Sequence, residues 1–307
     1  MNWNLPGHVP KSVSELVVQN CTDVSSLASM GRIAFSALDA GVAESIERGL
    51  AEAGMAVFSN TRCYRRHESV PILLPVVNPL HIEAIHSQPW SGSIVCNANC
   101  ASTGLVVALQ PLQERFGIAK LFITTMQACS GAGFPGVPSL QMIDNVVPYI
   151  SGEEDKLQYE PCKILGTWNA GGAAFEPLEL RISAACNRVA VQDGHMASVS
   201  IQFVKENVTV EMVNEALETF TSPVSDLKLP SAPQRPVQLF KDDPSRPQPR
   251  LDRDAGNGFV VSVGNVRPCT LFDVKFTVLS HNTIIGAAGG AILNAEFAMA
   301  KDLISLK

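Results

Sequence analysis

A strand, a tight turn and a helix follow one another within residues 94–113, and this segment constrains the fold more than any other. Ile94 and Val95 end an apolar run, residues 97–99 (NAN) form a turn, and an apolar segment with helical spacing begins near Leu105. Strands that alternate with helices are typical of α/β folds built on a parallel sheet. Cys100 stands where the turn becomes the helix. We therefore expect an α/β chain with this thiol at a strand-to-helix junction.

The position of Cys100 favours a nucleophile. A thiol at a helix start faces unpaired N–H groups and the positive end of the helix dipole, which both favour the thiolate. We therefore expect its pKa to lie below that of an ordinary cysteine, and Cys100 to be the most reactive of the eight cysteines. The other interpretation is a small buried hydrophobe, because free cysteines are often buried for packing alone.

Three polar residues downstream are candidate partners of the thiol. Gln127 ends an apolar run and precedes a glycine- and proline-rich stretch, where the backbone can approach a ligand closely. Arg188 offers a planar fork suited to a carboxylate or phosphate. His195 is a candidate acid or base. Each has a structural alternative: a strand-end amide, an ion pair with a nearby carboxylate, or a core histidine bonded to a carbonyl.

Several motifs together carry a resemblance. They are NANC at 97–100, QACSGAGFPG at 127–136, EEDK at 153–156, NRVAVQDGH at 187–195, RPQPRLDR at 246–253 and HNTIIGAAG at 281–289. In this order the chain resembles the aspartate-semialdehyde dehydrogenase family, most of all its fungal and archaeal-type branch. The resemblance extends from about residue 10 to the last helix.

The resemblance implies roles for individual residues. In that family a cysteine, here Cys100, attacks an acyl phosphate or aldehyde and carries a thioester. Gln127 matches the glutamine that orients the substrate, and His195 matches the acid/base histidine. Four further residues match substrate-binding positions of the family. Arg188 matches the arginine that clamps the substrate carboxylate, and Glu153 and Lys156 match a pair that holds amino and phosphate groups. The fourth is Asn99.

The front of the chain departs from the family pattern. A family member begins with a strand, a turn of the type Gly-x-x-Gly-x-x-Gly and a helix that holds the NADP phosphates. No such turn precedes the first strands here, and the dense glycine cluster at 286–290 matches the C-terminal helix instead. We therefore expect a natural short form with a truncated Rossmann-like domain and no cofactor.

Without a hydride donor, the acyl half of the family reaction remains. We expect Cys100 to carry a thioester on a small amino-acid-derived acyl substrate, as a hydrolase, acyltransferase or cyclising enzyme. Two alternatives stay open. One is an NADP-dependent aspartate-semialdehyde dehydrogenase of amino-acid biosynthesis seen as a truncated form. The other is a non-catalytic oligomer partner of a full-length paralogue.

The predicted fold class is α/β, with a partial doubly wound, Rossmann-like sheet followed by a mixed-sheet α+β catalytic and dimerisation domain. We expect three parts: a truncated nucleotide-binding-like domain (1–99), the catalytic and dimerisation domain (100–285) and a C-terminal helix that packs back on the first domain (286–307). The expected strands are 13–18, 31–37, 56–59, 70–77, 120–125, 178–185, 199–204 and 259–266, and the expected helices include 41–53, 79–86 and 210–220.

Composition narrows the partners. A net charge of −6 gives no electrostatic footprint for nucleic acid or an anionic membrane, and no apolar run is long enough to span a bilayer. The eight cysteines include no Cys-x-x-Cys pair, which predicts reduced thiols in the cytoplasm and no metal site. The basic stretch 62–67 suits a phosphate, although a solvated turn is the favoured interpretation. The proline-rich segment 222–253 cannot be a central strand, and the family resemblance implies that it is an arm that packs on a partner in a homodimer or tetramer.

Overall fold

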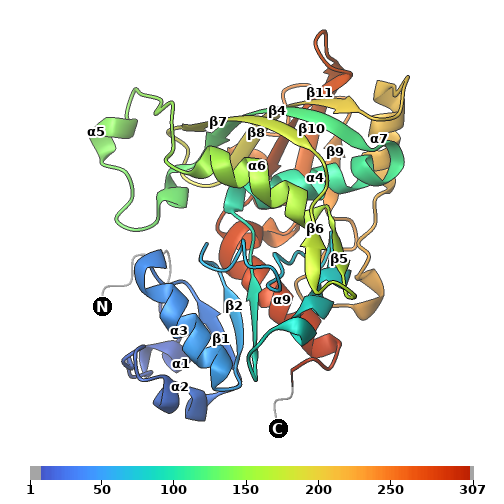
Figure 1. Ribbon diagram of the computed structural model, residues 1–307. Helices are drawn as coiled ribbons and strands as arrows, with labels where there is room; N and C mark the ends of the chain where they lie inside the picture. Colours follow the sequence, from blue (N-terminus) through green and yellow to red (C-terminus); the bar gives the residue numbers. More distant parts are fainter. Residues whose placement is uncertain (1–7, 305–307) are drawn as a thin grey trace.

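Figure 1 shows the computed structural model of the chain, which describes residues 8–304. Its first sheet is parallel, with the strand order β1-β2-β3: β1 (Ile33–Ser36), β2 (Ala56–Ser59) and β3 (Ser93–Cys96). Short strands joined through helices to a parallel sheet confirm the Rossmann-like half of the predicted fold class.

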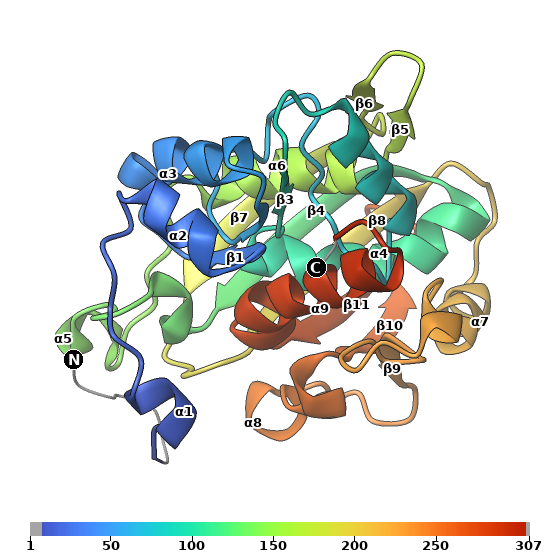
Figure 2. The ribbon, with the colours of Figure 1, turned by 90° about the horizontal axis from the view of Figure 1, so that it is seen from below.

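Helices cover both faces of the parallel sheet. On one face, α3 (Ala40–Glu52) packs Ile46 and Leu50 against Val57 and Ile94. On the other, α9 (Gly289–Ala300) brings Phe297 into the large core beside the β2 and β3 side chains of that face. Seen from below, these helices lie on opposite sides of the strands (Figure 2). The C-terminal helix therefore packs back on the N-terminal sheet, as the sequence predicts.

The second sheet is mixed and has the order β7-β4-β8-β11-β10-β9. Its strands are β4 (Ile118–Gln127), β7 (Arg181–Arg188), β8 (His195–Phe203), β9 (Val237–Phe240), β10 (Val261–Pro268) and β11 (Val274–Ser280). Three helices cover one face: α4 (Cys100–Phe116), α6 (Glu153–Ile164) and α7 (Val210–Thr219) (Figure 1). The helix α4 follows β3 of the parallel sheet directly in the chain and packs on the mixed sheet, so the segment that carries Cys100 joins the two halves of the fold.

The remaining elements are short. They are α1 (Lys11–Ser14), α2 (Val24–Met30), η1 (Pro79–Ser87), η2 (Cys129–Ala132), α5 (Ser139–Met142), β5 (Thr167–Asn169), β6 (Ala174–Glu176), η3 (Ser225–Leu227), α8 (Pro249–Asp252), η4 (Ala255–Gly258) and the π-helical turn η5 (Ile284–Ala288). Among the described residues, no helix is both long and apolar enough to cross a membrane.

Two predicted strands are wrong. Residues 13–18 form no strand, because Lys11–Ser14 is helical and Val17 and Val18 lie exposed, with no strand beside them within residues 8–304. Residues 70–77 make only an isolated bridge from Ile72 to Cys96, since the prolines at 71 and 75 cannot donate to a ladder. The strand β11 and the helix α6 were not expected. The predicted helix at 286–307 is α9 with a π-helical turn before it, and residues 305–307 lie outside the described part.

The predicted division into 1–99, 100–285 and 286–307 stays a prediction. The helix α4 packs on the mixed sheet and α9 on the parallel sheet, both contact η5, and one large core cluster contains side chains from each sheet.

Candidate functional site

The predicted site residues stand at the ends of five different elements. Cys100 begins α4, Gln127 ends β4, Glu153 begins α6, Arg188 ends β7 and His195 begins β8. The strands β4 and β7 are parallel and pair Gln127 with Arg188, so these two residues leave the sheet side by side. Functional side chains at strand ends, beside a helix start, are the usual arrangement of ligand sites in α/β proteins.

The thiol and the imidazole are in contact. Cys100 Sγ lies 3.2 Å from His195 Nε2. The other ring nitrogen, Nδ1, accepts a hydrogen bond of 3.0 Å from the backbone N–H of Ala128. A neutral imidazole carries one proton, so Nδ1 as acceptor places that proton on Nε2. His195 therefore presents an N–H donor to the sulfur, and its 3.5 Å contact with Gln127 Nε2 joins two donors and is no hydrogen bond.

Burial controls the protonation of both groups. Burial and the nearby Glu153 carboxylate raise the pKa of Cys100 to about 12, although part of the residue remains exposed. Burial and the positive charge of Arg188 lower the pKa of His195 to about 3. The predicted low pKa of the thiol is therefore wrong: desolvation outweighs the helix start and the nearby cations. The resting pair is a neutral thiol beside a neutral imidazole.

Glu153 organises the polar half of the site. Its carboxylate accepts hydrogen bonds from Asn99 Nδ2 at 3.1 and 3.0 Å and from Gln127 Nε2 at 3.2 Å, and Lys156 Nζ lies 2.5 Å away. Burial opposes ionisation, but these donors prevail and lower the pKa of Glu153. An ionised carboxylate thus fixes the orientation of three of the predicted site residues, Asn99, Gln127 and Lys156.

Arg188 is linked to His195 through the backbone of Ala128. It is buried, and Nη1 donates 2.9 Å to the carbonyl of Ala128, the same residue whose N–H holds His195. Gly131 covers both groups: a Cβ there would lie 2.9 Å from Arg188 Nη1 and 2.8 Å from His195 Cε1. The structure therefore brings together all seven predicted residues, and it needs glycine in the loop above them.

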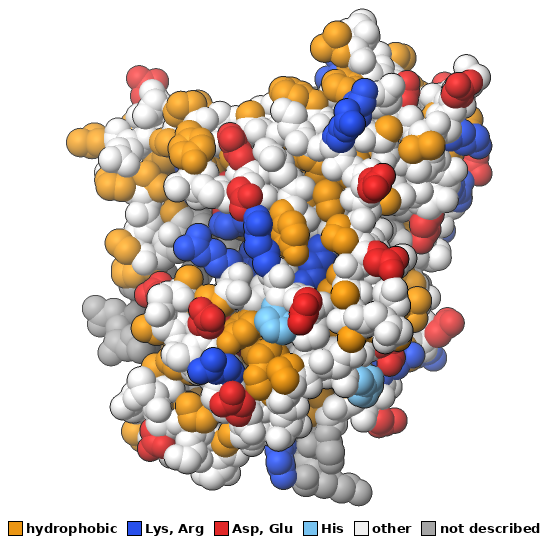
Figure 3. All heavy atoms as spheres, viewed as in Figure 1, with side chains coloured by type: hydrophobic (Ala, Val, Ile, Leu, Met, Phe, Trp, Pro, Cys, Tyr) orange, Lys and Arg blue, Asp and Glu red, His pale blue; other side chains and the backbone are white. Residues whose placement is uncertain are grey.

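A basic cavity of about 490 Å³ opens beside the site, between α3, the 61–67 loop and α6. Its basic lining residues are Arg62, Arg65, Arg66 and Lys156. Figure 3, which views the molecule from the same side as Figure 1, shows basic side chains gathered near the middle of the visible surface. The interpretation of 62–67 as a solvated turn holds only in part. Residues 63–66 form a turn with exposed Arg62 and Arg66, but Arg65 is buried, and Lys163 Nζ donates 2.8 Å hydrogen bonds to the carbonyls of Arg65, His67 and Val70.

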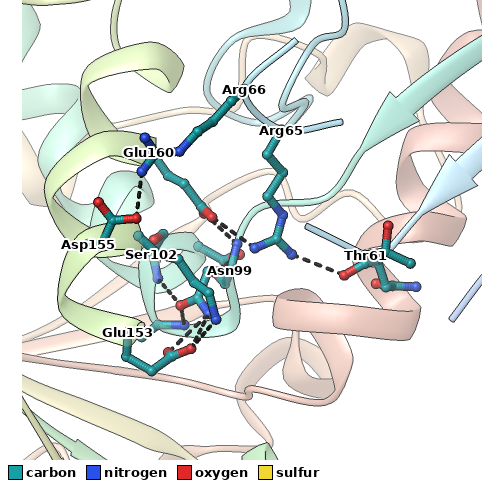
Figure 4. Close-up of polar contacts among 12 residues, drawn as sticks. Thr61, Arg65, Arg66, Asn99, Ser102, Glu153, Asp155 and Glu160 are labelled. Atoms are coloured by element: carbon teal, nitrogen blue, oxygen red, sulfur yellow. Dashed lines mark hydrogen bonds and ion pairs between the residues drawn. The ribbon is translucent and has the colours of Figure 1, made fainter. Parts of the chain in front are cut away.

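Sequence reasoning missed two buried residues next to the site, Arg65 and Glu160. Arg65 Nη1 lies 2.8 Å from Glu160 Oε1, and both side chains are nearly inaccessible to solvent (Figure 4). A helical interpretation of residues 153–164 would have found Glu160. It stands four residues after Lys156 and seven after Glu153, and residues at these spacings lie on the same face of a helix.

The raised thiol pKa predicts slow labelling of Cys100. Near pH 7, iodoacetamide should modify the exposed Cys21 before Cys100. The Cys100 rate should then rise about tenfold per pH unit between about pH 8 and 11, because the thiolate fraction grows until the pH reaches the pKa. Peptide mapping after timed labelling measures both rates. A Cys100 rate that is the fastest near pH 7, or that levels off below about pH 9, contradicts this account.

The chain resembles known proteins along its full length. Residues 3–85 match the semialdehyde dehydrogenase NAD binding domain, and residues 109–285 match the semialdehyde dehydrogenase dimerisation domain. The aspartate-semialdehyde dehydrogenase of Candida albicans is 46% identical over 99% of this chain and 87% of its own length. That of Archaeoglobus fulgidus is 45% identical over 89% of this chain and 78% of its own length.

Solved structures agree. The Candida albicans aspartate-semialdehyde dehydrogenase crystallised with NADP superposes with a TM-score of 0.90, at 45% identity, over 99% of this chain and 87% of that one. The Vibrio cholerae aspartate semialdehyde dehydrogenase II complexed with ASA superposes with a TM-score of 0.73, at 25% identity, over 89% of this chain and 80% of that one.

These findings correct two predictions. The expectation of no cofactor is contradicted by the NAD binding domain match and by the likeness to a structure with NADP. The expectation of a hydrolase, acyltransferase or cyclising enzyme without NADP falls with it, and the dehydrogenase alternative is the better supported one. The error came from weighing a single phosphate-binding turn, whereas a nucleotide crevice is formed by several parallel strands together.

Proposed function

Because this chain belongs to the aspartate-semialdehyde dehydrogenase family, we propose that it is an NADP-dependent aspartate-semialdehyde dehydrogenase of amino-acid biosynthesis. It would interconvert aspartate semialdehyde and the corresponding acyl phosphate through a thioester on Cys100. The observation that carries the proposal is the 3.2 Å contact of Cys100 with His195, inside a shell made of every residue that the family motifs assign to the reaction.

The described residues fit the nicotinamide end of NADP. The carboxyl ends of β1, β2 and β3 point to one edge, beside Asn97 and Cys100, where nucleotides bind in doubly wound sheets. Asn97 and Asn294 are linked there by a 2.8 Å hydrogen bond, and Asn294 Oδ1 is buried without a partner among the described residues. A free amide acceptor matches a carboxamide N–H donor, so Asn97 and Asn294 would hold that end. When bound, NADP supplies or accepts the hydride.

Arg188 and Glu153 suit the two ends of an aspartate-derived substrate. A planar guanidinium binds a carboxylate with two parallel hydrogen bonds, whereas the ionised Glu153 attracts an ammonium group. Gln127 lies between them at the end of β4 and has an amide to orient the reacting carbonyl. Three contacts hold the substrate with its carbonyl carbon near the sulfur. The attack is then effectively intramolecular instead of bimolecular.

His195 supports the sulfur as a donor. In the attack, Sγ forms a bond to the carbonyl carbon, the carbonyl oxygen takes the Nε2 proton of His195, and the thiol proton passes to the Nε2 atom that this leaves free. The Nε2–H group stabilises negative charge first on Sγ and then on that oxygen. The backbone contact with Ala128 keeps the imidazole in this tautomer, so His195 gives its Nε2 proton to the oxygen before it can accept the proton of the thiol.

The basic cavity suits the phosphate. In the oxidative direction an oxygen of hydrogenphosphate attacks the thioester carbon, the carbon–sulfur bond breaks, and the leaving Cys100 sulfur takes up the proton that the phosphate gives up. Lys156 belongs both to the cavity lining and to the Glu153 network, so it joins the phosphate side to the substrate side. Arg62 adds positive charge to the same volume, where Arg65 and Arg66 are paired with the lining carboxylates Glu160 and Asp155.

The proposal includes a homo-oligomer, a dimer or tetramer, supported by the dimerisation domain match at residues 109–285. The outer face of the mixed sheet carries the exposed Phe122, and the long 129–150 segment next to it exposes Phe134, Leu140 and Tyr149. Exposed apolar side chains of this size are typical of subunit contacts. The cytoplasmic location stays a prediction.

Replacing Arg188 tests the substrate site. Purified protein should form NADPH from aspartate semialdehyde and NADP over many turnovers only when phosphate is present. Arg188→Lys should raise the KM for aspartate semialdehyde about 10- to 100-fold, because a point charge cannot replace a planar fork whose charged hydrogen bonds contribute about 1.5–3 kcal/mol. The control is Arg181→Lys, at the exposed start of the same strand. An unchanged KM in Arg188→Lys would remove Arg188 from the site.

A further inference from the structure

One buried carboxylate connects the basic cavity with the turn that carries the nucleophile. Glu160 lies on α6 and is 2% exposed. Its Oε1 contacts Arg65 Nη1 at 2.8 Å, and its Oε2 accepts a 2.6 Å hydrogen bond from the backbone N–H of Asn99. The two oxygens thus serve two different segments, the cavity loop and the start of α4 (Figure 4).

The Asn99 end of this link sets the position of the thiol. Asn99 is the N-cap of α4, and its Oδ1 accepts hydrogen bonds from Ala101 N at 3.0 Å and Ser102 N at 3.4 Å. Its side-chain amide reaches Glu153. Cys100 therefore directly follows Asn99, whose backbone N–H is held by Glu160 and whose side chain caps the helix that Cys100 begins.

The Arg65 end is equally constrained. Arg65 Nη2 donates 3.0 Å to the carbonyl of Asn60, and the Arg65 carbonyl accepts from Lys163. Arg65 also lines the basic cavity and is one of the charges that favour the Cys100 thiolate. The carboxylate of Glu160 offsets this positive charge. It therefore affects the thiol in two ways, through the geometry of the turn and through the local electrostatic potential.

We propose that Glu160 is a positioning residue for the reaction. Its two oxygens fix the position of the turn before Cys100 relative to Arg65, which lines the basic cavity. Only the expected effect of Glu160 on turnover rests on the proposed function. Its effect on the Cys100 thiol needs neither substrate nor NADP.

Two substitutions separate the geometry from the charge. Glu160→Gln keeps the length and removes the charge, whereas Glu160→Asp keeps the charge and is too short to reach both partners. Each should lower kcat about 10- to 100-fold, because small displacements of a reacting group have effects of this size. Cys100 alkylation near pH 8 should become about 3- to 10-fold faster in Glu160→Gln, since losing a negative charge favours the thiolate, and should stay within about twofold in Glu160→Asp. The control is Glu114→Gln, on the exposed face of α4.

A merely structural role gives a different pattern. It would expose the buried Cys96 and Cys186 to alkylation together with Cys100. Should Glu160→Gln do this, Glu160→Asp decides: a lower kcat with Cys96 and Cys186 protected supports the proposal. Wild-type kcat and a wild-type alkylation profile in the folded variants overturn it. If the wild-type protein shows no turnover, the proposed function fails, and the alkylation rates of the two variants alone decide the role of Glu160.

Discussion

Cys100→Ser should abolish NADP-dependent turnover and leave the protein folded. The expected loss in kcat is about 10⁴-fold or more, because a serine hydroxyl next to a donor imidazole has no base to activate it and cannot carry a thioester. Serine is close in size to cysteine, so the start of α4 should keep its capping contacts. Steady-state NADPH formation measures the loss, and thermal unfolding checks the fold.

The matched control is Cys269→Ser, which changes a thiol in the turn between β10 and β11. This variant should keep wild-type kcat and KM. Residual activity of Cys100→Ser above about one hundredth of wild type would mean that another group attacks the substrate, since losing a covalent nucleophile is among the largest single effects known in catalysis. That result would leave Cys100 as a packing residue of the site.

His195→Asn should lower kcat by about 10²–10⁴-fold. Asparagine keeps a donor but loses the ring that Ala128 orients toward the sulfur. Because the folded-state pKa of His195 is lowered to about 3, the wild-type imidazole stays neutral from about pH 5 to 9. The pH profile of kcat should therefore show no step at the ordinary histidine pKa, and its alkaline rise should follow the raised pKa of Cys100.

The control for this variant is His86→Asn, a half-exposed surface histidine at the end of η1. It should leave both kcat and its pH profile unchanged. A wild-type profile with a clear step near pH 6.5 would contradict the neutral donor role, because it would require His195 to titrate during the working cycle.

Much of the fold was predictable because its signals are local. The helix at 40–52 shows apolar residues at helical spacing, and the strands β2, β4 and β8 are apolar or alternating runs bounded by turn residues. Residues 13–18 have the same strand-like composition but no neighbouring strand among the described residues. A strand needs a partner for its backbone groups, and its own sequence does not show one.

The grouping of the candidate residues in space was predictable, but their electrostatics were not. Cys100, Gln127, Arg188 and His195 lie together, as the order of the motifs implies, and their roles stay predictions. The pKa of the thiol was predicted in the wrong direction, because a helix start is visible in sequence whereas burial and a facing Glu153 are properties of the assembled fold. The tautomer of His195 depends on a backbone N–H 67 residues away along the chain, which no spacing reveals.

The most direct test of the account is a single turnover without phosphate. Protein mixed with aspartate semialdehyde and NADP should form about one NADPH per active site and then stop, because the thioester has no acceptor. Mass spectrometry of the acid-quenched protein should find the acyl adduct on the peptide that contains Cys100, and added phosphate should release it and restart NADPH formation. No NADPH burst, or an adduct on another residue, would contradict the assignment of this chain as an NADP-dependent dehydrogenase that works through Cys100.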